Sequence, residues 1–241
     1  MSSAATRNAG ELRYRLRCID KLRYAFRGTE SLLDVGCGDG GVAGLLRQRV
    51  REVVAIDMQP SPRWQDKPGL TFRVADGESL PFEDASFDLV HSKDSLHHMD
   101  SPERAVAEYR RVLKPGGAAL IVEANRYNPI FFPHMTLALG HEHFTRARLR
   151  TLVTTVFPRA RFGAFEAHYV PRLDRFAALQ DAVEEGLELL QGAGKGDLLA
   201  NNSGKQGGGL RQQGVLHTMP PFHQKHRSLS RPAQFSSFLP S

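Results

Sequence analysis

Cysteine is scarce in this sequence, and long hydrophobic runs are missing. The 241 residues include two cysteines, Cys18 and Cys37, which fall in an expected helix and in an expected glycine-rich loop. That placement is a poor basis for a disulfide, so we expect a reducing, cytoplasmic setting. No stretch approaches the roughly 20 apolar residues of a membrane span, and the first residues lack the apolar core of a signal peptide. The composition therefore predicts a soluble protein without a membrane span.

An excess of positive charge is also missing from most of the chain. The formal net charge is +6, but residues 1–192 hold 26 basic against 25 acidic side chains. Residues 193–241 hold six basic against one acidic side chain. The basicity therefore belongs to the C-terminal stretch and says little about what the folded part binds. Because no RNA-binding module is recognisable either, the sequence argues against a nucleic-acid partner.

The most informative stretch that is present is LLDVGCGDGG, residues 32–41. An apolar run ends in Asp34, a glycine-rich turn follows, and from Val42 onward the apolar residues have helical spacing. This order predicts a strand, a tight turn and a helix whose first N–H groups face a ligand. Glycine suits such a turn because the backbone takes positive φ and because a side chain would keep the ligand away from the amides. Loops of this kind bind adenine-containing cofactors.

The glycines of this loop are compatible with two cofactors. Gly36, Gly38 and Gly41 fit the dinucleotide pattern G-x-G-x-x-G. Counted with Gly40 instead of Gly41 as the third glycine, the loop also fits the pattern G-x-G-x-G of enzymes that use S-adenosylmethionine (SAM). Asp34 discriminates between them, because a carboxylate there would repel a pyrophosphate but would suit the ammonium group of SAM. An aspartate that only caps the loop is the alternative.

Strands and helices alternate after the loop. Residues 52–57 form a β-branched run that ends in Asp57, which lies 21 residues after Gly36. At this spacing a carboxylate accepts both ribose hydroxyls of a cofactor. Further strands are expected at 70–74, 86–92, 118–123 and 161–169, and helices are expected to begin at Ser101 and Thr145. The alternation predicts a doubly wound, mostly parallel α/β sheet.

Taken together, the motifs resemble those of class I SAM-dependent methyltransferases. The shared features, in this order over residues 10–175, are LLDVGCGDGG, Asp57, the pair Asp76 and Gly77, the FDLV strand, LHH at 96–98 and RRVLKPGG at 110–117. The resemblance is strongest to the small-molecule group that includes ubiquinone and menaquinone biosynthesis enzymes. It implies a Rossmann-like sheet of seven strands, SAM at the carboxyl ends of the first strands, and methyl transfer to an O, N or C atom of a small-molecule acceptor.

The resemblance also implies the residues of the cofactor site. By this resemblance, Asp57 would hold the ribose of SAM and Asp76 would hold the adenine. The methionine part would be lined by three glycines, Gly36, Gly38 and Gly40. His91 or Ser92, at the end of the fourth strand, would lie near the cofactor. The complete expected set is Asp34, Gly36, Gly38, Gly40, Asp57, Met58, Asp76, Gly77, His91 and Ser92.

The catalytic candidates follow from the chemistry of methyl transfer. Transfer from a sulfonium is a direct displacement, so positioning supplies much of the catalysis, and a general base is needed only if the acceptor loses a proton. The candidates for acceptor contact or proton abstraction are Asp94, His97, His141 and His143. For the histidines at 97–98 the competing interpretation is structural packing, and for residues 140–144 it is a solvated loop. The run His141-Glu142-His143 lacks a distant third ligand, so we expect no metal site.

The two ends of the chain are predicted to differ from the middle. Residues 1–10 are expected to be flexible, and residues 11–27 to form a basic amphipathic helix with Leu12 and Leu16 on its apolar face. This helix either covers the cofactor pocket or makes peripheral contact with a membrane. From residue 192 onward glycine, glutamine, serine and proline dominate, which predicts a disordered tail at 192–241 and a methyltransferase domain at 11–191. The seventh strand has only a poor candidate at 210–219, so we expect an incomplete or altered C-terminal strand.

Three other functions are compatible with parts of the sequence. An NAD(P)-dependent oxidoreductase would share the glycine loop and Asp57, but it would leave Asp34 and Asp76 without a role. A methyltransferase-fold protein that only binds or regulates is favoured by the altered-looking C-terminal end. A methyltransferase that acts on protein or RNA is the third, since class I domains serve all these acceptors.

Overall fold

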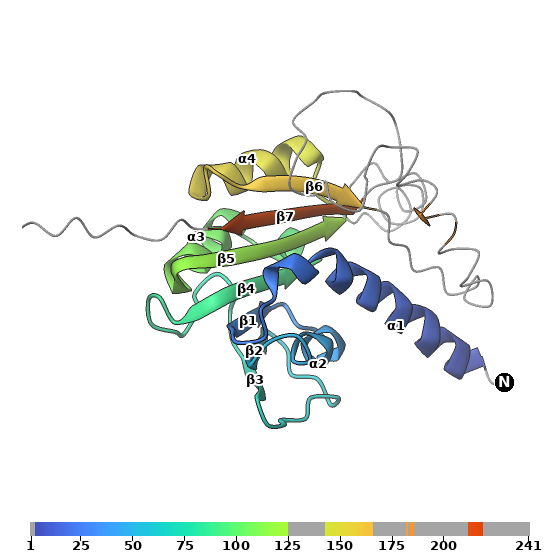
Figure 1. Ribbon diagram of the computed structural model, residues 1–241. Helices are drawn as coiled ribbons and strands as arrows, with labels where there is room; N and C mark the ends of the chain where they lie inside the picture. Colours follow the sequence, from blue (N-terminus) through green and yellow to red (C-terminus); the bar gives the residue numbers. More distant parts are fainter. Residues whose placement is uncertain (1–2, 125–142, 166–181, 183, 186–211, 219–241) are drawn as a thin grey trace, which may run out of the picture.

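The computed structural model describes residues 3–124, 143–165, 182, 184–185 and 212–218, and it shows a seven-stranded sheet flanked by helices (Figure 1). The strands are β1 (Ser31–Val35), β2 (Glu52–Asp57), β3 (Leu70–Val74), β4 (Phe87–Lys93), β5 (Leu113–Ala124), β6 (Arg161–Phe165) and β7 (Gln212–Thr218). The helices are α1 (Ser3–Lys21), α2 (Gly41–Leu46), α3 (Pro102–Val112) and α4 (Arg146–Val156), with short 3-10 turns η1 (Arg23–Ala25) and η2 (Leu96–His98).

The strand order is β3-β2-β1-β4-β5-β7-β6. Neighbouring strands from β3 to β5 run parallel, and β7 runs antiparallel to both β5 and β6. The chain crosses over between β1 and β4, where Asp34 lies opposite His91. In doubly wound sheets ligands bind beyond the carboxyl ends of the strands at such a crossover. The predicted fold class is confirmed, and its topology places a site at the ends of β1 and β4.

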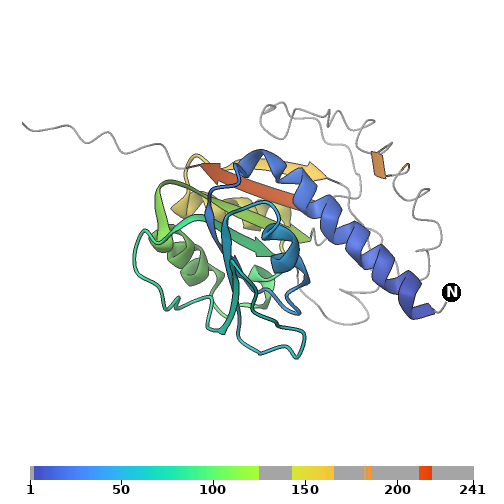
Figure 2. The ribbon, with the colours of Figure 1, turned by 60° about the horizontal axis from the view of Figure 1, so that its bottom comes forward.

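Each face of the sheet has its own apolar core, because successive side chains of a strand point to opposite faces. One face packs against α1 and α2, and the other packs against α3 and α4 (Figures 1 and 2). Leu32 and Leu33 show the alternation, since both are fully buried but belong to different cores. Burial of one such side chain contributes about 1.5–3 kcal/mol. The two cores fix the sheet between its helices, so the strand ends are rigid supports for a site.

The starts of two helices were predictable from their caps. The Ser101 hydroxyl accepts a hydrogen bond from the Arg104 amide at 3.4 Å, and Pro102 takes the first helical position of α3. The Thr145 hydroxyl accepts a hydrogen bond from the Arg148 amide at 3.1 Å at the start of α4. Replacing such a cap by alanine typically costs about 1 kcal/mol. Both predicted helix starts are confirmed.

The expected incomplete C-terminal strand is wrong, because β7 completes the sheet. The strand occupies Gln212–Thr218, within the weak candidate at 210–219, and pairs along its length with β5 and β6. Backbone pairing to two neighbours holds a strand of low propensity, since β-propensity mostly reflects fit to its surroundings. Residues 212–218 therefore belong to the domain and not to a disordered tail. Residues 192–211 and 219–241 lie outside the described part, where the predicted tail stays a prediction.

The N-terminal helix also differs from expectation. α1 begins at Ser3 and ends at Lys21, so residues 3–10 are helical and the expected helix at 11–27 is interrupted. Leu12 and Leu16 are 47% and 40% exposed instead of buried. The helix is turned so that Tyr14 and Arg15 face the carboxyl end of the sheet, where polar partners are available. Among the described residues, no helix is long and apolar enough to cross a membrane.

Candidate functional site

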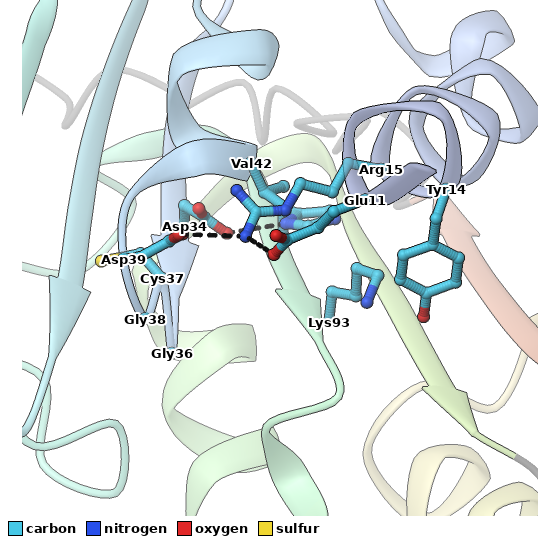
Figure 3. A pocket seen from close by; sticks show the side chains of 11 residues that line it. Glu11, Tyr14, Arg15, Asp34, Gly36, Cys37, Gly38, Asp39, Val42 and Lys93 are labelled. Atoms are coloured by element: carbon cyan, nitrogen blue, oxygen red, sulfur yellow. Dashed lines mark hydrogen bonds and ion pairs between the residues drawn. The ribbon is translucent and has the colours of Figure 1, made fainter. Parts of the chain in front are cut away.

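A cavity of about 430 Å³ opens beside the carboxyl ends of β1 and β4, with α1 as one wall (Figure 3). Three parts of the chain line it. The glycine loop and the start of α2 contribute Gly36, Cys37, Gly38, Asp39 and Val42, the strand ends contribute Asp34, His91 and Lys93, and α1 contributes Glu11, Tyr14 and Arg15. The cavity thus lies where the sequence placed the cofactor.

The glycine loop needs its glycines for two different reasons. Gly36, Gly38 and Gly40 have φ values of 74°, 55° and 81°, which side chains rarely adopt. A Cβ on Gly36 would also lie 2.4 Å from the Cβ of Ser95, so η2 leaves no room for one. Gly36 and Gly38 line the cavity, whereas Gly40 packs against the ring of Phe72. The loop is therefore shaped by neighbours on both sides, and only its first two glycines form the wall.

Asp34 lines the cavity, and one of its carboxylate oxygens has no hydrogen-bond partner among the described residues. The side chain is 2% exposed, and its Oδ1 lies 2.7 Å from Nδ1 of His91. Its Oδ2 is buried and accepts no hydrogen bond from the described residues. A buried acceptor without a donor costs about 1–3 kcal/mol, and more when it is charged. A ligand with a cationic donor would remove this cost, so the residues present fit the ammonium group of SAM.

Asp57 holds the glycine loop from the end of β2. Its Oδ2 accepts the Gly38 amide at 2.8 Å, and its Oδ1 accepts the Gln59 amide at 3.2 Å. Each carboxylate oxygen has a second lone pair, so both oxygens are still able to accept ribose hydroxyls. The indole of Trp64 donates to the Gly38 carbonyl at 2.8 Å. Gly38 is thus fixed through both its N–H and its C=O.

The expected adenine-side residues lie outside the cavity walls. Met58, directly after β2, is 70% exposed, and Val74, which lies opposite Asp57 at the end of β3, is 58% exposed. Asp76 accepts the Glu78 amide at 2.8 Å in the following turn, and Gly77 is enclosed by Met99 and Val35. Two exposed apolar side chains at a ligand site are suited to cover a flat ring. Their contact with adenine stays a prediction.

Ser92 is not part of the cavity wall. It is fully buried on the face of α3, where it accepts the Tyr109 hydroxyl at 3.2 Å and lies 3.0 Å from the hydroxyl of Ser95. Ser95 in turn donates to the Val35 carbonyl at 3.2 Å. This chain of hydroxyl groups ties η2 to the end of β1. Ser92 therefore acts on the site indirectly, by holding η2 in place, whereas its neighbour His91 lines the cavity.

A second polar cluster lies at the ends of β4 and β5. Nδ1 of His97 lies 2.7 Å from Oε2 of Glu123, and both side chains are buried. The other oxygen of Glu123 accepts the amides of Ser95 and Leu96 at 3.1 and 2.8 Å. Burial raises the pKa of Glu123, while its hydrogen bond with His97 lowers it in part. Glu123 thus orients the imidazole and anchors η2 at the same time.

The histidines around His97 are close to one another. The His97 ring lies 4.0 Å from that of His98 and 4.4 Å from that of His143, measured between ring centroids. Two of the predicted catalytic residues are therefore adjacent. The candidate His141 lies outside the described residues. The described part of the chain contains no group of three potential metal ligands.

Asp94 joins the helix α1 to the ends of β4 and β5. Its Oδ2 accepts the Tyr14 hydroxyl at 3.2 Å and pairs with Lys93, and its Oδ1 accepts the Ala124 amide at 3.1 Å. Burial would raise the pKa of Asp94, but the charge of Lys93 and the hydrogen bonds from Lys93 and Tyr14 together outweigh burial and lower the pKa. Burial lowers the pKa of Lys93, whereas the charge of Asp94 raises it. The pKa of Lys93 therefore lies well above its usual value. The two side chains therefore form an ion pair at neutral pH.

Arg15 connects α1 to the glycine loop across the cavity. It pairs with Glu11 of the same helix and with Oδ2 of Asp39 at 3.0 Å (Figure 3). The same oxygen of Asp39 pairs with Arg63 at 2.9 Å. Burial alone would raise the pKa of Asp39, but the charge of Arg15 and the hydrogen bonds from Arg15, the Gly41 amide and Arg63 together outweigh burial, so the pKa lies below its usual value. α1 is thereby fixed as a wall of the cavity.

Comparison with known proteins identifies the family. The methyltransferase domain family matches residues 33–121. An uncharacterized methyltransferase of Synechocystis sp. is 33% identical over 147 residues, which cover 58% of this chain and 68% of that protein. The chain belongs to the class I SAM-dependent methyltransferases. The predicted family and the predicted cofactor, SAM, are therefore confirmed, and the oxidoreductase alternative has no support.

Other similarities are narrower. Tocopherol O-methyltransferase of Arabidopsis thaliana is 33% identical over 159 residues, which cover 58% of this chain and 43% of that protein. A SAM-dependent methyltransferase of Methanosarcina mazei has a similar fold, with a TM-score of 0.53, 18% identity, and coverage of 83% of this chain and 97% of that one. At this identity the likeness shows the fold alone. The chain spans less than half the length of the tocopherol enzyme, so its substrate does not carry over directly.

Sequence reasoning did not single out Tyr14, Arg15 and Lys93, which line the cavity, or Glu123 of the neighbouring polar cluster. Glu123 had a readable signal, because it ends a strand as Asp34 and Asp57 do. Tyr14 and Arg15 had none, since their role depends on how α1 is turned.

Proposed function

We propose that this methyltransferase moves the methyl group of SAM to the oxygen of a hydroxyl-bearing small molecule. The observation that carries the proposal is the buried pair of His97 and Glu123 at the ends of β4 and β5. A hydroxyl group must lose its proton as the new C–O bond forms, so its methylation benefits from a general base. Among the O, N and C acceptors that the family uses, this pair favours oxygen.

The pair has the arrangement of an oriented base. Because Nδ1 of His97 donates to Glu123, the free lone pair of the neutral ring lies on Nε2, which takes the proton of the acceptor. The carboxylate of Glu123 stabilises the resulting imidazolium. Its two additional backbone hydrogen bonds keep it in place whether or not His97 is protonated. The catalytic work of the protein is then to orient the acceptor and remove one proton.

The cofactor is held by residues of the first strands. SAM, when bound, supplies an electrophilic methyl group on a sulfonium. Asp34 would accept its ammonium group with the unsatisfied Oδ2, and Asp57 would accept the ribose hydroxyls. Asp76 and Met58 would contact the adenine. These assignments rest on the buried Oδ2 of Asp34, which has no partner among the described residues, and on the exposed Met58 at the end of β2.

Two further observations support catalysis on a small molecule. A relative that is 33% identical is named as a tocopherol O-methyltransferase. The complete sheet also removes the main argument for an inactive binding protein, because β7 fills the position that the sequence seemed to lack.

The test is methyl transfer from radiolabelled SAM to a panel of phenols, alcohols, amines and carbon acids, with RNA and protein extracts as further arms. We expect label in hydroxyl compounds. His97→Ala should reduce turnover about 100-fold or more, while its affinity for S-adenosylhomocysteine stays within a factor of three. His98→Ala is the matched control, because His98 is a neighbouring exposed imidazole without the bond to Glu123. Label only in RNA or protein, or turnover that is independent of His97, would overturn the proposal.

A further inference from the structure

SAM ends in an amino acid whose ammonium and carboxylate groups are both charged at neutral pH. A cation beside the anion of Asp34 would pair with this carboxylate. We propose that Lys93 binds the carboxylate of the methionine part of SAM, so that Asp34 and Lys93 together hold the two charges of the amino acid. The proposal rests on SAM binding in this cavity and assigns the residue that selects its charged end.

The sheet places Lys93 next to Asp34. Asp34 of β1 lies opposite His91 of β4, and Lys93 lies two residues further along β4. Side chains two residues apart on a strand point to the same face and are separated by about 6.5–7 Å. Asp34, His91 and Lys93 thus share one face, and all three line the cavity. Lys93 lies on the side of Asp34 that is nearer the open end of the sheet.

Lys93 remains a cation there with donor capacity to spare. Its side chain is 12% exposed, its ammonium pairs with Asp94, and it lies 4.5 Å from the centre of the Tyr14 ring. Burial lowers the pKa of Lys93, but Asp94 and Tyr14 both raise it, so the ammonium stays charged. An ammonium group has three N–H donors, so it is able to serve Asp94 and a ligand together. Asp94 also accepts hydrogen bonds from two neutral donors, the Tyr14 hydroxyl and the Ala124 amide, so Lys93 is not its sole partner.

Arg15 is the other cation in the wall, and it is already engaged by two anions. It pairs with Glu11 and with Asp39, and Figure 3 shows these carboxylates on either side of its guanidinium. A ligand carboxylate at Arg15 would be a third anion beside these two, and like charges at such distances repel. Among the described residues, Lys93 pairs with one carboxylate, that of Asp94. Lys93 is therefore the better partner for a new anion.

The experiment compares two ligands by titration calorimetry. One is S-adenosylhomocysteine, and the other is its decarboxylated analogue, which keeps the ammonium but lacks the carboxylate. With the wild-type chain we expect the first ligand to bind about 10- to 100-fold more tightly, as for a charge-assisted hydrogen bond. Lys93→Met should remove this difference by weakening S-adenosylhomocysteine alone. Arg15→Met is the matched control and should leave the difference in place.

Loss of the fold is separated from loss of the contact by a second variant and a second measurement. Lys93→Met leaves Asp94 without its counter-ion, so Lys93→Met combined with Asp94→Asn removes both charges and should show the same carboxylate-specific loss. Melting curves without ligand report the fold of each variant. Equal weakening of both ligands by Lys93→Met, or a carboxylate-specific loss in Arg15→Met, overturns the proposal. If the wild-type chain binds neither ligand, the cofactor site itself is misassigned.

Discussion

Glu123 bonds to His97 through one carboxylate oxygen and to the backbone of η2 through the other. The side chain that orients the imidazole is therefore the same one that shapes the turn carrying it. The geometry of the proposed base, His97, is therefore set by the fold before an acceptor binds.

Replacing Glu123 by glutamine should separate turnover from stability. The new amide group donates to Nδ1 of His97, which moves the ring proton to Nε2 and removes the lone pair that takes the acceptor proton. We expect turnover to fall by at least 100-fold, in line with the effect of a wrong tautomer in other enzymes. Affinity for S-adenosylhomocysteine, measured by calorimetry, should change little. A Glu123→Gln variant with normal turnover would contradict the proposed base.

The same variant has an expected effect on stability. Burial raises the pKa of Glu123, so the folded chain holds this proton more tightly than the unfolded chain does. Ionisation of Glu123 therefore costs folding free energy as the pH rises through its folded pKa. Glu123→Gln should melt at an equal or higher temperature than wild type at neutral pH, by about 2–4 °C per kcal/mol. The difference should disappear below about pH 4, where the carboxyl is protonated in both states.

Cofactor binding should stabilise the fold through Asp57. S-adenosylhomocysteine at about 100 times its dissociation constant should add roughly 2.7 kcal/mol, whereas NAD and NADP should add nothing. Asp57→Ala should abolish most of this effect, because it removes the ribose acceptor and the bond to the Gly38 amide. Asp84→Asn, at a side chain that is 79% exposed, is the control in the same thermal-shift assay. Stabilisation by NAD alone would contradict the assignment of the cofactor.

Trp64 should report ligand binding by its fluorescence. It is the single tryptophan of the chain, it donates to the Gly38 carbonyl, and it stacks on Phe72 at 5.4 Å between ring centroids. A ligand that contacts the glycine loop will change the surroundings of this indole. Titration with S-adenosylhomocysteine should give a saturable change whose midpoint matches calorimetry. A Phe72→Leu variant should alter the starting spectrum and keep the midpoint within a few-fold.

Two truncations should show where the domain ends. Removing residues 219–241 should leave the melting temperature and S-adenosylhomocysteine binding unchanged, because the predicted tail lacks an apolar period. Removing residues 212–241 also deletes β7, which leaves β6 without its paired strand and β5 with an open edge, so we expect a large loss of soluble, folded protein. Hydrogen exchange should find protected amides at 212–218. Unprotected amides at 212–218, or equal stability of the two truncated chains, would show that these residues are not a strand of the folded domain.

The sequence was most informative where structure is local. The glycine loop, the strand-end acids Asp34 and Asp57, and the caps Ser101 and Thr145 were predictable because each depends on neighbouring residues. The orientation of α1 and the strand β7 were not, because both depend on contacts between distant segments. For β7 in particular, composition favoured a tail, and only pairing with β5 and β6 makes it a strand.

The place of β7 in the sheet also affects how the chain is made. The last described strand lies between β5 and β6, so β6 has no neighbour until residues 212–218 have been synthesised. At roughly 5–20 residues per second, the stretch from β5 to β7 takes on the order of 5–20 s to emerge. During this interval β5 presents an open edge that is able to pair with other chains. Pairing of β6 in the sheet therefore follows translation of β7, and the open edge of β5 is an aggregation hazard until then.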